Sequence, residues 1–272
     1  MGKDNETYLS FGTRALRTTV AGVGSLVLRS EVEKPVSRGW RRAEDLSEGG
    51  SGIIVAHPHF SMGDPLQVIK RVFESPVLRK REVFVPQTLR HYTRLYGPLG
   101  RPISVKVFPV ATPEDAQRAR ANEELHQKLL RKYKVDVLDT RSAVPLFQTY
   151  AREAVTLLER GAVEIVAPQA TREGKLITVT DAVGIVLRRA LRRNVHNIGV
   201  LFVGLGIDGV TDYGQKSVSG INAFRSHRYQ DGRCLTLDEI ANEVGGDLEA
   251  ANLGAFVRQE MEKTVPPEYL DR

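Results

Sequence analysis

The amino-acid sequence predicts an α/β fold, with a mostly parallel central sheet covered by helices. From about residue 52 to residue 205, short apolar runs alternate with segments of helical periodicity, an alternation typical of this class. A hydrophobic fraction of 41% over 272 residues allows a sizeable core. We see no internal repeat and no low-complexity linker. We therefore expect a single domain with an N-terminal helical extension (1–50), a core (51–210) and a C-terminal helical extension (211–272).

The first predicted strand and helix follow each other closely. The run Gly52 to Ala56 is apolar and comes after a turn-prone segment, as a buried strand would. Asp64 and Pro65 have the form of an N-cap and a first helical residue. The helical spacing places these residues toward the core: Leu66, Ile69, Val72 and Phe73.

The later elements are predicted in the same way. The run Thr112-Pro113-Glu114-Asp115 has the form of a capping box, with proline at the first helical position, and opens a long charged helix ending near Tyr133. A helix over about 146–160 ends at Gly161 and places on one face Phe147, Tyr150, Ala154, Leu157 and Leu158. Further strands are expected at 83–86, 103–110, 163–167 and 198–205, and a further helix at 182–193.

Charge and cysteine content limit the partners and the compartment. Lysine and arginine outnumber acids by 39 to 33, which favours acidic partners such as anionic lipid surfaces, phosphorylated substrates or an acidic acyl carrier protein. Nucleic acid is not an expected partner, because no binding motif accompanies the charge. The single cysteine, Cys234, rules out an intrachain disulfide and favours a reducing, cytoplasmic location. We expect Cys234 to be an ordinary thiol rather than a nucleophile.

The apolar stretch from Thr18 to Leu28 is too short to span a membrane. Because Arg14 and Arg17 precede it, it is either an amphipathic helix lying on the inner face of a membrane or a helix packed on the protein's own core. The sequence leaves both alternatives open. The arginines at positions 188, 189, 192 and 193 pose a similar choice between a solvated helix face and a contact with an anionic membrane or carrier protein.

The segment from His57 to Pro65 (HPHFSMGDP) carries the chemistry. Histidine titrates near neutral pH and can take a proton from a hydroxyl group. A carboxylate nearby can orient the imidazole and stabilise its charged form. His59 follows a predicted strand and Asp64 begins the next helix, so a tight turn would bring both to the carboxyl end of the sheet.

The pattern His59-x-Ser61-x-x-Asp64-Pro65 resembles the first sequence block of the glycerol-3-phosphate and lysophosphatidate acyltransferase family. The run Pro168-Gln169-Ala170-Thr171-Arg172 is similar to the third block, in which the family has glutamate and glycine where this chain has Gln169 and Ala170.

The resemblance implies a glycerol-3-phosphate acyltransferase-like fold and a role for each matching residue. His59 would be the general base and Asp64 its orienting partner, with Ser61 in the turn between them. Arg172, with Thr171 and Gln169, would hold the acceptor, and Arg101 or Lys106 would stand in for the basic residue of the second block. The donor would be acyl-CoA or acyl carrier protein, the acceptor a glycerolipid precursor, and neither a cofactor nor a metal would be needed.

Two alternatives compete with this interpretation. His57 and His59 together have the His-x-His form of a metal-dependent hydrolase on a β/α barrel, although His57 is otherwise expected to be structural. The altered third block is also compatible with a lipid- or membrane-binding protein that keeps the acyltransferase fold without its chemistry.

Overall fold

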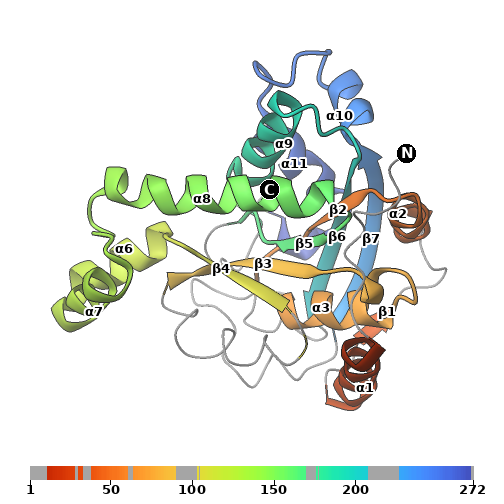
Figure 1. Ribbon diagram of the computed structural model, residues 1–272, viewed down its shortest axis with the longest axis horizontal. Coiled ribbons are helices and arrows are strands. Elements are labelled where there is room, and N and C mark those ends of the chain that lie inside the picture. Colours follow the sequence, from red (N-terminus) through yellow and green to blue (C-terminus); the bar gives the residue numbers. More distant parts are fainter. Residues whose placement is uncertain are drawn as a thin grey trace.

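The computed structural model describes residues 11–27, 30–32, 38–60, 64–89, 103, 105–169, 176, 178–207 and 227–270. The strands are β1 (Ser30–Val32), β2 (Gly52–Ala56), β3 (Val83–Thr88), β4 (Val105–Val110), β5 (Val163–Val166), β6 (Ile198–Ile207) and β7 (His227–Thr236). They form one seven-stranded sheet in the order β1-β7-β6-β2-β5-β3-β4 (Figure 1). Neighbouring strands are parallel except β6 and β7, which confirms the predicted α/β class. The described sheet is open, with β1 and β4 at its edges, so the β/α barrel of the metal-hydrolase alternative is wrong.

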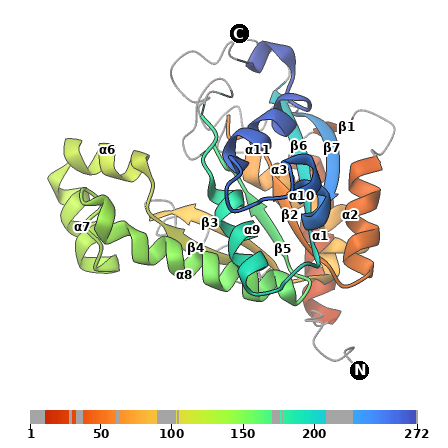
Figure 2. The same ribbon diagram turned by 90° about the horizontal axis from the view of Figure 1, so that it is seen from above.

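The helices lie on both faces of this sheet (Figure 2). They are α1 (Phe11–Val27), α2 (Arg38–Glu48), α3 (Asp64–Glu74), α6 (Pro113–Ala121), α7 (Glu123–Tyr133), α8 (Thr140–Glu159), α9 (Ala182–Arg192), α10 (Leu237–Glu243) and α11 (Leu253–Glu262), with short 3-10 turns η1 (Leu78–Lys80) and η4 (Pro267–Tyr269). Alternate residues of β2 show the two faces: Ile54 packs under α8 and α9, whereas Ile53 packs under α2 and α3. The core therefore has two layers of apolar side chains separated by the sheet.

The N-terminal helix packs on the protein's own core, which decides between the two alternatives for this segment. Arg17 is fully buried, and its guanidinium donates to the carbonyl oxygens of Ile103, Arg79 and Arg81 at 2.8, 3.1 and 2.5 Å. Its charged group also lies 4.7 Å from the centre of the Phe73 ring. Within the described part of the chain, no helix is long and apolar enough to cross a membrane.

Several local predictions need correction. The long charged helix is two helices, α6 and α7, because Asn122 adopts an extended conformation and its side chain caps α7 by accepting from the Leu125 backbone at 2.9 Å. Leu66 was expected in the core but is 36% exposed, since Val68 takes the buried position on α3. The two terminal extensions contain the expected helices, and each also contributes a strand, β1 or β7, that the sequence did not predict.

The helices α6 and α7 project beyond β4 at one end of the molecule, as both ribbon views show (Figures 1 and 2). A small cluster of buried side chains lies beneath them and is formed by Leu89, Ala119, Leu129, Val135 and Val137. This hairpin occupies the segment between Val110 and Val163. From it the chain returns to the body of the protein along α8, which ends where Gly161 adopts a φ of 78°.

Candidate active site

The first motif lies where β2 ends, at the carboxyl edge of the parallel strands. The backbone of His57 continues the ladder by donating to Val166 O at 3.0 Å, and the chain then leaves the sheet. Phe60 is buried, and its ring stacks on Tyr269 with the ring centres 5.0 Å apart. This packing holds Phe60 in place against Tyr269.

Asp64 begins α3, where the sequence predicted a helix-capping acid, and its side chain is buried. Its Oδ2 accepts a hydrogen bond from the Phe60 backbone at 2.6 Å, so the carboxylate ties the start of α3 to Phe60. A negative charge at this position is also favoured by the partial positive charge at the start of the helix. The local sequence therefore holds an anionic side chain directly beside the histidine segment.

His57 is more important to the site than the sequence suggested. It is 1% exposed, it lines the pocket described below, and its Nδ1 lies 2.7 Å from Pro58 O. Burial lowers the pKa of His57, and the bond to Pro58 and the charge of Asp64 only partly offset this effect. Because a carbonyl oxygen can only accept, the neutral ring carries its proton on Nδ1 and has Nε2 as a hydrogen-bond acceptor.

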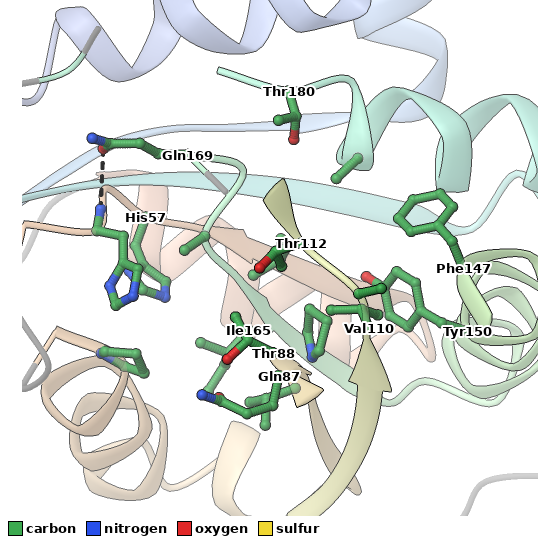
Figure 3. Close-up of a pocket in the computed structure, with 18 of the residues that line it drawn as sticks. His57, Gln87, Thr88, Val110, Thr112, Phe147, Tyr150, Ile165, Gln169 and Thr180 are labelled. Atoms are coloured by element: carbon green, nitrogen blue, oxygen red, sulfur yellow. Dashed lines mark hydrogen bonds between the residues drawn. The ribbon is translucent and has the colours of Figure 1, made fainter. Parts of the chain in front are cut away.

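His59 and Gln169 join the two sequence blocks that the resemblance identified. Gln169 is fully buried just beyond β5, and its Oε1 accepts from the His59 backbone at 3.3 Å across 110 positions of sequence (Figure 3, dashed line). The ring of His59 is partly exposed and lines the pocket. The structure therefore places these two positions next to each other at the end of the sheet.

The pocket has a volume of about 380 Å³. Figure 3 shows His57 and Gln169 on one side and Val110, Phe147 and Tyr150 on the other. The residues that line the space between them come from the ends of β3, β4 and β5 and the start of α9, and include Gln87, Thr88, Thr112, Ile165, Thr180 and Ile185. One end is therefore rich in imidazole and amide groups, whereas the other is largely apolar.

A buried acid lies behind the apolar end. The Tyr150 hydroxyl donates to Glu164 Oε1, and both side chains are at most 2% exposed. Burial raises the pKa of Glu164 to about 7, and the bond from Tyr150 lowers it only in part. Burial beside Glu164 likewise raises the pKa of Tyr150. The tyrosine lines the pocket and the acid does not.

The start of α9 forms another wall of the pocket. Thr180 donates to Pro168 O from both its backbone nitrogen and its hydroxyl, at 2.9 and 2.7 Å. This ties the start of α9 to the third block. Asp181 forms an ion pair with Arg188.

Two further arginines of the α9 cluster also have partners, because Arg192 pairs with Glu249 and Arg193 with Glu159. These contacts favour the simpler interpretation of that cluster as a paired surface.

The predicted substrate-binding residues are only partly described. Gln169 lies in the site, whereas Ser61, Arg101, Thr171 and Arg172 lie outside the described residues. Lys106, the alternative to Arg101, lies on β4 with its ammonium 5.0 Å from the centre of the Phe108 ring and is not among the residues that line the pocket.

The sequence interpretation also missed pocket residues, chiefly Thr88, Thr112, Tyr150 and Asp181. The sequence indicates only that each of these residues lies near the end of a predicted strand or on the inner face of a predicted helix.

Comparison with known proteins leaves the resemblance as a hypothesis. No family model and no curated protein matches the chain. Within the described residues, no group of three or more histidine, cysteine, aspartate or glutamate side chains is arranged to hold a metal ion. Cys234 is buried, and burial raises the pKa of its thiol to about 12, as expected for an ordinary thiol.

Proposed function

We propose that the protein is an acyltransferase that moves a fatty acyl group from a thioester donor, acyl-CoA or acyl carrier protein, to a hydroxyl of glycerol 3-phosphate, a lysophospholipid or a related glycerolipid. The observation that carries the proposal is the hydrogen bond between His59 and Gln169. It joins the first and third motif blocks at the carboxyl edge of the sheet, beside a pocket with one polar and one apolar end. Open α/β sheets bind their ligands at this edge.

In this mechanism His59 takes the proton of the acceptor hydroxyl while the hydroxyl oxygen attacks the thioester carbonyl carbon. The tetrahedral intermediate then breaks its carbon–sulfur bond, and the thiolate takes the proton back from the imidazolium. The role proposed for the Asp64 carboxylate, at the start of α3, is to favour the charged imidazolium. No acyl-enzyme forms, so the residues need only align the hydroxyl group with the carbonyl carbon and exclude water.

The apolar end of the pocket supports an acyl chain as the cargo. Val110, Phe147 and Ile185 offer hydrocarbon surface within one connected space that reaches the histidines. Burying a methylene group there gains about 0.8 kcal/mol. A chain in this space would hold its carbonyl carbon near the imidazole end.

The test is transfer of a labelled acyl group from acyl-CoA and acyl carrier protein to a panel of acceptors, with the product identified by mass spectrometry. His59→Ala should lower kcat/KM by about a hundredfold or more, because the base is lost. Asp64→Asn should also have severely impaired activity. Because Asp64 accepts a hydrogen bond from the Phe60 backbone, a thermal melt of this variant should show whether it is still folded. His196→Gln is the matched control, since His196 is 52% exposed and does not line the pocket.

Activity near that of the wild type in His59→Ala would contradict this mechanism. His57 would then be the next base to test, because it lines the same pocket with Nε2 as an acceptor. Arg172→Ala should raise the KM of a phosphorylated acceptor far more than that of the donor, and Arg172→Lys should recover only part of the loss. A lipid-binding protein without catalysis remains the second candidate, favoured by Gln169 in place of the family's glutamate. Tight binding of acyl donors without any product would support it.

A further inference from the structure

A polar pair that an ordinary hydrocarbon chain does not need lies at the apolar end of the pocket, with Tyr150 in its wall and Glu164 behind that wall. Tyr150 is 2% exposed, reaches from α8 toward the sheet and lines the pocket (Figure 3). Its hydroxyl donates to Oε1 of Glu164, which is 1% exposed on β5. The other oxygen, Oε2, has no hydrogen-bond partner among the described residues. Burying such groups costs stability, so a pocket that evolved only for alkyl chains would be expected to use apolar side chains here.

A second polar side chain lines the same space. Thr88 lies at the end of β3, the strand next to β5 in the sheet, and it lines the pocket between the histidine end and Tyr150 (Figure 3). Its Oγ1 is enclosed and has no hydrogen-bond partner within the described part of the chain. A ligand group in this part of the pocket would therefore lie beside two polar side chains, Thr88 from β3 and Tyr150 from α8.

The charges around these atoms select against an anion. The lining residues that the structure describes include no lysine or arginine. Glu164 lies directly behind Tyr150, and a carboxylate or phosphate placed there would be repelled whenever Glu164 is ionised. A neutral hydroxyl group can both donate and accept, so it suits the Tyr150 oxygen and the Thr88 hydroxyl equally.

We propose that the Tyr150 end of the pocket is a subsite for an uncharged hydroxyl group carried along the acyl chain, so that hydroxylated chains are preferred over plain ones. The inference rests on the proposed function, because it takes the pocket to hold the acyl chain. The ligand hydroxyl donates to the Tyr150 oxygen, whose own proton is donated to Glu164 and holds that oxygen in place. Tyr150 is thus a specificity residue and Glu164 a positioning residue.

The experiment measures dissociation constants by calorimetry for dodecanoyl-CoA and for a matched series with one hydroxyl at successive carbons of the chain. At one or two neighbouring positions the hydroxylated chain should bind the wild-type protein about three- to tenfold more tightly than the plain chain, the gain of one well-formed hydrogen bond. Tyr150→Phe should abolish this preference while retaining affinity for the plain chain. Glu164→Gln should keep most of it, because the amide oxygen still accepts from Tyr150.

Phe147→Leu is the control for loss of packing at the same end of the pocket. Its affinity for plain and hydroxylated chains should fall together, with their ratio unchanged. A preference that survives Tyr150→Phe would overturn the proposal, and so would a plain chain that binds at least as tightly as every hydroxylated one. The wild-type comparison decides the question even if Tyr150→Phe does not fold. If neither kind of chain binds, the proposed acyl pocket itself is wrong. If both bind equally well, only the hydroxyl subsite is wrong.

Discussion

Replacing Glu164 with glutamine should change how the free energy of unfolding depends on pH. Burial raises the pKa of the Glu164 carboxyl from 4.5 to about 7, so the folded state holds this proton more tightly than the unfolded state. The stability that the carboxyl contributes is therefore fully present below about pH 4.5 and is lost as the pH rises through about 7. Glutamine keeps an oxygen that accepts from Tyr150 but cannot ionise, so the variant lacks this loss.

The expected magnitude follows from the two pKa values. The gap between 4.5 and about 7 corresponds to about 3 kcal/mol at about 1.36 kcal/mol per pH unit. The unfolded state is already partly ionised at about pH 5 and the folded state still partly protonated at about pH 8, so about 2 to 3 kcal/mol of this is lost between those two pH values. Relative to the wild type, Glu164→Gln should gain that amount of stability across the window.

The measurement is urea denaturation of both proteins at a series of pH values. The slope of the free energy of unfolding against urea concentration should be the same for both proteins, which excludes a change in the unfolded state. Subtracting the two profiles cancels every other titrating group. Tyr150→Phe removes the hydrogen bond that lowers the pKa of Glu164, so its stability should fall more steeply with pH than that of the wild type. If the free energies of unfolding of the wild type and Glu164→Gln differ by the same amount at every pH, the reasoning is refuted.

Two further predictions concern the core. Gly52→Ala should destabilise the protein by roughly 2 kcal/mol, because a Cβ there would lie 2.3 Å from the carbonyl oxygen of Leu158. Gly22→Ala on α1 is the control and should be neutral or stabilising, because nothing lies within 4 Å of the added Cβ. Denaturation curves compare the two variants, and equal stability would count against the close packing of α8 on β2. Cys234 should not react with a thiol reagent in the native protein, since burial raises the pKa of its thiol to about 12, and it should react on unfolding. Fast reaction at neutral pH in the folded state would be inconsistent with its burial.

The sequence alone determined the features that depend on neighbouring residues. The strand at Gly52–Ala56, the capping box at Thr112 and the helix end at Gly161 are all as predicted, because each rests on periodicity or capping within a few positions. The same local logic placed Asp64 at the start of α3, beside the histidine segment. The fold class followed from the alternation of such elements.

Only the tertiary structure decided what lies beside what. The strand β7 contains Arg228, Gln230 and Asp231 and has no clear β pattern, and it becomes a strand because it pairs with β6. The pairing of Tyr150 with Glu164 depends on how α8 packs across β5, and the meeting of His59 with Gln169 depends on β2 and β5 being neighbours in the sheet. Local patterns record the conformational preference of a segment, whereas sheet order and side-chain partners are fixed by burying the apolar surface of the whole chain at once.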